Sequence, residues 1–392
     1  MSQPERAKMI REIEKMRSSS LICYLTSLRP NLPANMGDDA VRVMFDHLLS
    51  LPKRPVENLD IFLCSNGGSG TVPWRLVSVF REFAEKFNVL IPYRAYSAAT
   101  LLALGADEIV MHPFGELGPI DPTVSNEYNP VEQGTGRRLG ISVEDVKAYV
   151  NFIKNGVGIT HEDELIRAVE VLANKVHPLA LGNVERFLAQ SRLIAGKIMR
   201  THMQGVDEHT IKEIVENLAS KLYFHGHPIN RREAKQDLKL KVIDPVNSRL
   251  ERLMWKLYMD FEEEFKNRVT FDPYSDLASA YDLPEFTQQP SASQWKEYEL
   301  IHAIIESVPF SDRHIIKRKL RLVAPGPGQV AMQDAILSQG WIRSPAPKEE
   351  SRSRPSGTSA EDAPLGQQAP AKAPDPRDHA KRHRSAARKQ RP

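Results

Sequence analysis

Through its first third, the chain alternates short apolar runs with segments in which apolar residues recur every three or four positions. The runs predict buried strands, and the spaced segments predict amphipathic helices. Strands and helices alternating with short loops are typical of parallel βαβ units with right-handed crossovers, so we predict an α/β fold. In such sheets, sites form where strands end and helices begin. The predicted strands are 21–25, 61–64, 89–96 and 109–111, and the predicted helices are 5–17, 38–51, 76–87 and one that starts at Ser97.

Beyond residue 124 the pattern becomes mainly helical. Pro178 and Gly205 are expected to interrupt a long helical stretch, because proline removes a backbone donor and glycine has a low helix propensity. A short helix after Asn230 leads into an apolar ending at 240–243. The other predicted helices are 141–154, 162–222 and 247–267, and 295–342 is predicted to contain smaller helical pieces.

Charge is distributed unevenly along the 392 residues, whose net charge is +3. Residues 343–392 contain 12 Lys/Arg, 6 Asp/Glu and almost no large apolar residues, so we expect a disordered basic tail. The rest of the chain has a net charge of −3, which argues against a nucleic-acid platform. We interpret the tail as solvated. A weak contact with nucleic acid or an acidic partner is the alternative.

The cysteines and the hydropathy pattern indicate in which cellular compartment the protein is expected. Cys23 and Cys64 lie in apolar runs, which predicts buried thiols rather than a disulfide framework or a zinc site. The chain has no run of about 18 apolar residues and no apolar core of signal-peptide length near residue 1. We therefore expect a soluble, cytoplasmic protein.

The first junction that is a candidate functional site is the glycine-rich turn Cys64–Gly70, directly after a predicted strand. Glycine lets the backbone adopt positive φ and approach a ligand closely. Successive N–H groups at the start of a helix favour negative charge and can form an oxyanion hole. A tight strand-to-helix turn without chemistry is an equally good interpretation of this segment alone. The turn matches neither a phosphate loop nor a dinucleotide fingerprint.

The second junction is Tyr96-Ser97-Ala98-Ala99, where a predicted strand ends and a helix begins. A serine at this place can simply be the helix N-cap. However, the two alanines leave room around its hydroxyl, and the helix N-terminus stabilises nearby negative charge. If the two strands are neighbours, Ser97 and the glycine turn together form the minimum constellation for acyl transfer.

These residues resemble a known family. Asp60–Gly68 is similar to the strand and double-glycine turn of ClpP/crotonase-fold proteins. The segments Ser97–Val110 and Gly118–Pro122 resemble the serine dehydrogenase proteinase family, relatives of bacterial signal peptide peptidase. Gly226–Asp244 is similar to the closing helix and strand of the same fold, so the resemblance covers roughly 10–245.

The resemblance implies a ClpP/crotonase-like core of repeated ββα/βαβ units with additional C-terminal helices and a disordered tail. The expected domains are a peptidase domain at 1–245, a helical extension at 246–342 and the tail at 343–392. The resemblance also implies a nucleophile at Ser97 and oxyanion donors at Gly67, Gly68 and Ser69. Ser65-Asn66 departs from the family's usual Thr-Pro before the two glycines.

A serine nucleophile needs a base within hydrogen-bond reach. No Ser-His-Asp triad is visible, and the nearest histidine, His112, is expected to be a strand-end residue. Signal peptide peptidases use a lysine from a later helix, which must be desolvated for its pKa to fall toward neutrality. Lys147 and Lys154 lie seven residues apart on one side of the predicted helix, about 10 Å apart along its axis. Register in the motif favours Lys154, and the bare spacing from Ser97 fits Lys147 about as well.

The leading hypothesis is a serine peptidase that hydrolyses peptide bonds with a Ser-Lys dyad, with a peptide or protein substrate. The alternatives are a non-catalytic scaffold or recruitment protein of the same fold, or a crotonase-type acyl-CoA enzyme. We predict no metal and no cofactor, because His225 and His227 have no third ligand at a diagnostic spacing and no nicotinamide fingerprint is present. Proteins of this fold generally assemble, so a homo-oligomer is expected.

Overall fold

A mixed sheet is the centre of the computed structural model, which describes residues 3–32, 34–121, 123–124, 127–132, 138–221, 226–245 and 248–345. Residues 1–347 form one compact unit. The strand order in the part described is β10-β5-β3-β2-β1-β12-β13-β11, and β14 also pairs with β13. The strands are β1 (Ser20–Thr26), β2 (Val56–Cys64), β3 (Ala84–Ile91), β5 (Glu108–Met111), β10 (Val242–Ile243), β11 (Ser291–Ala292), β12 (Lys296–Glu306), β13 (Phe310–Gly326) and β14 (Gln329–Pro345).

The half of the sheet from β10 to β1 is parallel, as the βαβ pattern predicts. Leu25 is in register with Cys64, and Leu90 is in register with both Phe62 and Val110. The half beyond β1 is antiparallel and begins where β12 pairs with β1. The carboxyl ends of β2, β3 and β5 therefore meet at one edge of the sheet, where the sequence predicts the site.

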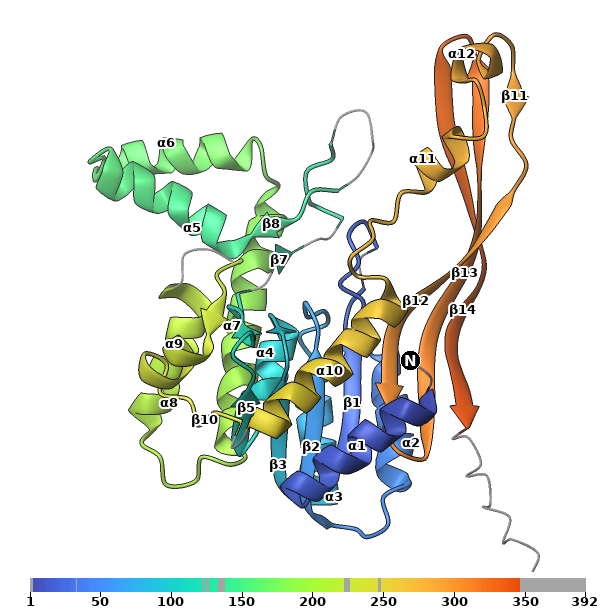
Figure 1. The fold of residues 1–392 in the computed structure, drawn as a ribbon. Helices are drawn as coiled ribbons and strands as arrows, with labels where there is room; N and C mark the ends of the chain where they lie inside the picture. Colours follow the sequence, from blue (N-terminus) through green and yellow to red (C-terminus); the bar gives the residue numbers. More distant parts are fainter. Residues whose placement is uncertain are drawn as a thin grey trace, which may run out of the picture. The chain divides into compact units, whose positions relative to one another are not determined.

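Helices cover both faces of the sheet. Helices α1 (Gln3–Arg17) and α10 (Ser248–Phe265) lie across one face (Figure 1) and pack on Cys23 and Phe62. Helices α2 (Asp39–Leu49), α3 (Val72–Phe83), α4 (Ala98–Ala103) and α7 (Pro178–Arg200) contribute to the apolar core on the other face. Because both faces are buried, the strands read as continuous apolar runs.

Smaller elements follow the parallel strands. A second sheet has the order β4-β6-β9, and β7 pairs with β8. Their strands are β4 (Arg94–Ala95), β6 (Glu116–Leu117), β7 (Thr123–Val124), β8 (Ile141–Ser142) and β9 (Ile229–Asn230). The remaining helices are α5 (Val143–Asn151), α6 (Glu162–Ala173), α8 (Glu208–Glu216), α9 (Arg231–Gln236), α11 (Pro273–Ala278) and α12 (Leu283–Phe286), with π-helical turns η1 (Phe152–Gly156) and η2 (Asn217–Lys221).

The interruptions predicted in the long helical stretch are confirmed. Pro178 is the first residue of α7, where its missing N–H costs nothing because the first helical N–H groups have no intrahelical acceptor. Gly205 has φ +86° and lies between α7 and α8.

Two sequence predictions about secondary structure are wrong. The helix predicted for 76–87 ends at Phe83, and Phe87 faces the core from strand β3. The smaller helices predicted for 295–342 are the long strands β12, β13 and β14. In β12, the consecutive residues Ile304 and Ile305 pack into the cores on opposite faces of the sheet. An apolar pair buried on both faces has the same spacing as the stripe of an amphipathic helix, so the sequence pattern was ambiguous.

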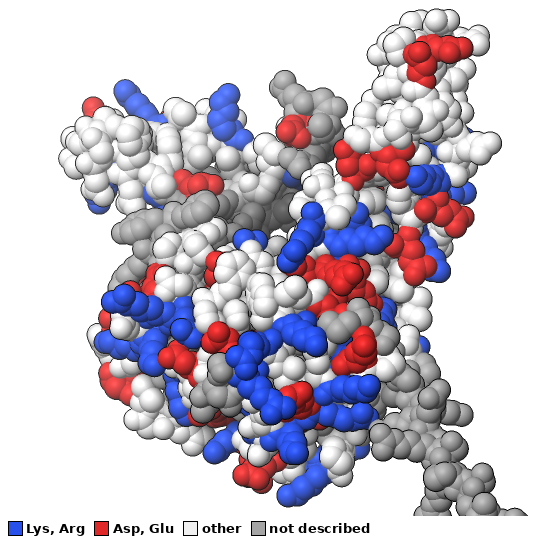
Figure 2. Space-filling view, viewed as in Figure 1, with Lys and Arg blue, Asp and Glu red and all other residues white. Residues whose placement is uncertain are grey.

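The C-terminal strands thus continue the sheet of the core, whereas the sequence predicted a helical extension at 246–342. Strand β14 ends at Pro345 and so includes the first three residues of the predicted tail, and 346–392 lie outside the described residues. Within the described ranges, no helix is long and apolar enough to cross a membrane. On the face shown in Figure 2, basic and acidic side chains are interspersed rather than separated by sign.

A buried ion network joins helices α1 and α10 to strand β12. The Arg6 guanidinium donates two hydrogen bonds to the Glu306 carboxylate, each 3.0 Å long, and a third to Asp260 at 2.9 Å. All three side chains are buried. Because an unpaired buried charge is strongly unfavourable, this network links α1, α10 and β12.

Candidate active site

The two predicted junctions lie side by side at the carboxyl ends of neighbouring strands. The Ser65 N–H donates to the Arg94 carbonyl at 2.8 Å, and the Tyr96 N–H donates to the Ser65 carbonyl at 3.0 Å. This short parallel bridge continues β2 beside β4. It sets the glycine turn against the segment that carries Ser97, as the sequence hypothesis required.

Ser97 occupies a strained position at a sharp strand-to-helix turn. Its φ is 52° and its ψ is −115°, in a region that L-residues rarely adopt, and helix α4 begins at the next residue. The Ser97 hydroxyl is half-buried and makes no hydrogen bond within the described part of the chain. A serine held on a strained strand-to-helix turn is the geometry of the nucleophile elbow, which exposes the hydroxyl above the sheet.

Thr100 fixes this turn from inside the helix. Its buried hydroxyl lies 2.7 Å from the Ala95 carbonyl and 2.8 Å from the Gly118 carbonyl, and it accepts the Gly118 N–H at 3.1 Å. The strained conformation of Ser97 is therefore held between two anchored strands, which is how local strain persists in a folded protein.

The glycine turn approaches Ser97 so closely that a side chain does not fit. Gly67 has φ +100°. A Cβ atom on Gly67 would lie 2.7 Å from the Tyr96 carbonyl oxygen, 2.8 Å from the Ser97 Cβ and 3.0 Å from the Ala98 nitrogen. The turn therefore needs glycine for both its conformation and its close approach.

Two of the three predicted oxyanion donors are already engaged. The Gly67 N–H donates to the Ser65 hydroxyl at 3.0 Å. The Ser69 N–H donates to the Met36 carbonyl at 2.9 Å. Among the hydrogen bonds of the described residues, none uses the Gly68 N–H, so Gly68 is the member of the predicted set whose donor is available.

The sequence prediction omitted a further donor, the Ala98 N–H. Ala98 is the first residue of α4, so its N–H has no acceptor within the helix. In the region that the structure describes, this N–H has no other acceptor. The sequence position of Ala98, directly after the proposed nucleophile, could have identified this donor. The N–H that follows a nucleophile commonly contributes to an oxyanion hole. The departure at Ser65 also has a structural role, since its hydroxyl holds the glycine turn.

The structure does not join either candidate lysine to Ser97. Lys147 lies on α5 and is half-buried, and Lys154 lies on the π-helical turn η1 and is exposed. The Ser97 hydroxyl forms no hydrogen bond with either side chain, as far as the described residues extend. Helix α5 packs against α7 and β8.

Large apolar side chains are exposed near Lys154. Phe152 is 62% exposed, and Val150 and Val157 are also exposed. Figure 2 shows few charged side chains over the α5–α6 region. Such a surface favours burial against another surface, because apolar groups exposed in clusters commonly mark interaction sites.

The contacts of His112 are those of a structural residue rather than a catalytic base, as the sequence analysis favoured. Its ring stacks on Trp255 at 5.1 Å between centroids, and its Nδ1 accepts the Phe114 N–H at 3.1 Å. Burial lowers the pKa of His112. A neutral ring that accepts a backbone hydrogen bond is thus favoured at this turn.

A serine-histidine-aspartate chain that could not be found from the sequence lies away from the glycine turn. His47 Nδ1 is 2.6 Å from the Ser307 hydroxyl, and His47 Nε2 is 3.1 Å from an Asp312 carboxylate oxygen. His47 has no exposed surface, and Phe310 packs on its ring at 4.2 Å. Burial lowers the pKa of His47, although the hydrogen bond that its ring donates to the Asp312 carboxylate opposes the shift. Because no substrate can reach this group, its role is to attach β13 to α2.

Comparisons with known proteins show what the N-terminal third of the chain resembles. Residues 1–133 match the model of the family described as ClpP-like SDH-type serine proteinase. These residues include the glycine turn and the Ser97 segment, whereas the sequence resemblance extended to about residue 245.

Two curated relatives come from Methanocaldococcus jannaschii. Uncharacterized protein MJ1495 is 27% identical over 129 residues, which are 31% of this chain and 42% of that protein. Uncharacterized protein MJ0137 is 24% identical over 132 residues, which are 32% of this chain and 45% of that protein. The matched region thus spans less than half the length of either relative.

Among solved structures, the chain is similar to a 1510-N membrane-bound stomatin-specific protease. The two are 14% identical with a TM-score of 0.32, and the match covers 59% of this chain and 80% of that one. This similarity is too low to inform the site. The family match confirms the resemblance found in the sequence: residues 1–133 of this chain are similar to the ClpP-like SDH-type serine proteinase family.

Proposed function

We propose that this protein is a serine peptidase in which Ser97 is the nucleophile and the Gly68 and Ala98 N–H groups form the oxyanion hole. The observation that carries the proposal is the strained turn at Ser97 against a glycine turn that leaves no room for a side chain. Strain of this kind concentrates at functional sites, where the surrounding structure maintains it. The family match over the same residues supports hydrolysis of peptide bonds.

In the proposed reaction, the Ser97 Oγ attacks the carbonyl carbon of the scissile peptide while its proton moves to a neutral lysine amine. The oxygen of the tetrahedral intermediate becomes an anion and accepts the Gly68 and Ala98 N–H groups. When the C–N bond breaks, the leaving amine takes the proton from the lysine ammonium, and an acyl ester remains on Ser97. A water molecule, deprotonated by the same lysine, then hydrolyses this ester and restores the hydroxyl.

The Gly68 and Ala98 N–H groups suit this role because their places in the backbone leave both free to donate to a substrate oxygen. The Ala98 N–H lies at a helix start and the Gly68 N–H in a turn of positive φ, so neither donates within regular secondary structure. The neighbouring N–H groups of Gly67 and Ser69 instead hold the turn through Ser65 and Met36. Donors fixed in advance stabilise developing charge without reorganisation in the transition state.

For the base we propose Lys154, with Lys147 as the alternative. Lys154 is exposed in the single chain, so it must approach Ser97 and lose its surrounding water before it can act. Covering the apolar side chains beside it, with a peptide substrate or a second copy of the chain, would favour the neutral amine. We therefore expect a peptide or protein substrate and a homo-oligomer, acting in the cytoplasm.

The proposal is tested with a fluorophosphonate probe, which phosphonylates an activated serine oxygen and releases fluoride. The wild-type protein should be labelled, and Ser97→Ala should not. The matched control is Ser307→Ala, because Ser307 belongs to the buried histidine-aspartate chain. Equal labelling of wild type and Ser97→Ala, or loss of labelling in Ser307→Ala alone, would overturn the assignment.

The base is assigned by the rate of the same labelling. Lys154→Ala should slow it by about 10²–10⁴-fold, the usual contribution of a general base. Lys147→Ala should have little effect, and the exposed Lys175→Ala serves as a control for loss of a positive charge. If Lys147→Ala alone slows labelling, the base is Lys147. If neither variant does, the dyad is rejected.

A scaffold function remains the second candidate. The observation that favours it is the absence of a base hydrogen-bonded to Ser97 within the described residues. A scaffold should remain folded and unlabelled by the probe, and Ser97→Ala should leave its assembly and partner binding unchanged.

A further inference from the structure

A cavity of about 290 Å³ lies at the opposite end of α4 from Ser97. It is bounded by the end of α4, the end of α7 with the turn that follows it, and the loop that leads into β10. Its apolar wall includes Leu104, Met199, Met203, Val206 and Leu240. The volume is close to the lower limit of sites that hold small organic ligands.

The polar group of this wall is the imidazole of His202. Its Nδ1 is buried and has no hydrogen-bond partner in the described part of the chain. Burial, and after it the positive charge of Arg81, lowers the pKa of His202 to about 4. A hydrogen bond to the Ile198 backbone opposes this shift. The ring is therefore neutral near pH 7, with one N–H and one lone pair between its two nitrogens. It is a polar group in an otherwise largely apolar part of the wall.

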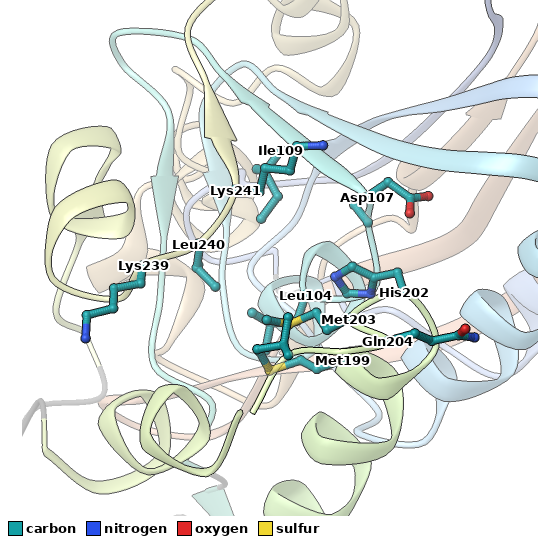
Figure 3. A pocket seen from close by; sticks show the side chains of 12 residues that line it. Leu104, Asp107, Ile109, Met199, His202, Met203, Gln204, Lys239, Leu240 and Lys241 are labelled. Atoms are coloured by element: carbon teal, nitrogen blue, oxygen red, sulfur yellow. The ribbon is translucent and has the colours of Figure 1, made fainter. Parts of the chain in front are cut away.

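The charged residues around the cavity have other contacts. Asp107 accepts the Phe87 N–H at 2.8 Å and forms an ion pair with Arg81. Lys241 forms an ion pair with Glu108 at 3.2 Å and is largely exposed. In Figure 3, the His202 ring lies close to Leu104 and Met203, and the Lys239 side chain extends away from the other labelled side chains. Gln204 also lines the cavity and is exposed. The polar groups without a charge are thus the enclosed His202 ring and the Gln204 amide at the open side, within an apolar wall that suits an uncharged ligand.

We infer that this cavity is a binding site for a small, uncharged, mostly apolar molecule with a single hydroxyl group, of the class that phenol represents. A hydroxyl can either donate to or accept from the His202 ring. The two methionines can adjust to an aromatic ring, because the thioether is flexible and makes favourable contacts with ring edges.

The position of the cavity gives the ligand an effect on the proposed nucleophile. Ser97 and Leu104 flank the six-residue helix α4 as its N-cap and C-cap, so the two sites are about 10 Å apart along one short element. Helix α4 also packs against α7, which forms another wall of the cavity. A ligand that contacts both helices favours one position of α4 over others and thereby changes Ser97 reactivity. This effect rests on the proposed function, whereas the binding does not.

Binding is measured by NMR on protein labelled at the methionine methyl groups, with phenol as the probe. The Met199 and Met203 signals should shift with a saturable dependence on phenol concentration. The Met254 signal should not, because that residue is buried in the core on the other face of the sheet. Toluene, which replaces the hydroxyl with a methyl group, should bind at least fivefold more weakly.

Two variants make the inference falsifiable. Val206→Trp places a large ring at the rim, where Val206 is 40% exposed, and should abolish the shifts without disturbing the core. His202→Phe should remove the preference for phenol over toluene. Shifts that persist in Val206→Trp, or equal affinity of the wild type for the two probes, would overturn the inference.

The effect on reactivity is read separately from fluorophosphonate labelling. Saturating phenol should change the labelling rate of wild type at least twofold and leave that of Val206→Trp unchanged. If phenol binds and the rate is constant, the effector role is rejected and the binding site stands. If the protein is never labelled, the proposed peptidase fails while the NMR result still decides the binding site.

Discussion

Replacing Gly67 with alanine tests the contact between the glycine turn and the nucleophile. The new Cβ would lie 2.7 Å from the Tyr96 carbonyl oxygen and 2.8 Å from the Ser97 Cβ. Since non-bonded atoms prefer separations of about 3.5–4.0 Å, the turn must recede from Ser97 by roughly 0.7 Å. The left-handed φ of +100° adds backbone strain for any residue with a side chain.

The magnitudes follow from these two effects. The strain and overlap should lower the free energy of unfolding by about 1–3 kcal/mol. The shift moves the Gly68 donor away from the position of the oxyanion. Loss of one such donor, or a misplacement near 1 Å, reduces a catalysed rate by about 10²-fold or more. We therefore expect fluorophosphonate labelling of Gly67→Ala to be about 10²-fold slower than that of wild type.

Labelling rates are compared at a temperature where urea titration shows both proteins to be fully folded. The matched control is Gly70→Ala in the same turn, because a Cβ at Gly70 would have no heavy atom within 4 Å. This control should label and unfold like wild type. If Gly67→Ala labels at the wild-type rate, or if both variants lose reactivity equally, the assigned contact between the turn and Ser97 is incorrect.

Three further predictions concern other contacts. Ser65→Ala should slow labelling about tenfold and lower the free energy of unfolding in urea by about 1–3 kcal/mol, because the buried Gly67 N–H and Thr26 hydroxyl lose the oxygen that accepts them. Arg6→Ala should lower the free energy of unfolding in urea by about 3–5 kcal/mol, because Glu306 remains as an unpaired buried charge, and a change below 1 kcal/mol would refute the structural role of the network. Burial lowers the pKa of His302 to about 4, so the unfolded state binds more protons between about pH 6.5 and 4, and stability should fall as the pH decreases through that window. His302→Leu should flatten this pH dependence, and an unchanged slope would refute the assignment.

The parallel core could be predicted because its strands and helices are local and strongly patterned. The strands have apolar residues on both faces, and the strand-end loops are marked by Gly67 and by the small residues after Ser97. Element boundaries were less certain. Phe83 and Phe87 have helical spacing, but the chain changes from helix to strand between them.

The C-terminal strands could not be distinguished from helices by period alone. Leu300, Ile304 and Ile305 fit an amphipathic helix, and the actual alternation is hidden because β12 is buried on both faces. Strand β12 pairs with β1, which is about 280 residues earlier in the chain. Contacts at that sequence separation leave no local signal in one sequence.

The same limit applied to the site. Ser97, the proposed nucleophile, and the glycine turn have local signatures, and so could be named as candidates from the sequence. Whether the Ser69 N–H can serve as an oxyanion donor depends on Met36, because the Met36 carbonyl, which belongs to a different loop, already accepts it. The buried pair of His47 and Asp312 joins residues 265 positions apart, so the sequence offered no means to pair them. The lysine depends on the packing of α5 and η1, and its assignment stays a prediction.

Peptide mapping of the fluorophosphonate adduct by tandem mass spectrometry tests the central claim most directly. The account predicts one phosphonylated residue, Ser97, in the folded wild-type protein, and no adduct in Ser97→Ala. An adduct on another serine such as Ser307, or no adduct on a protein whose fold is intact, would contradict it.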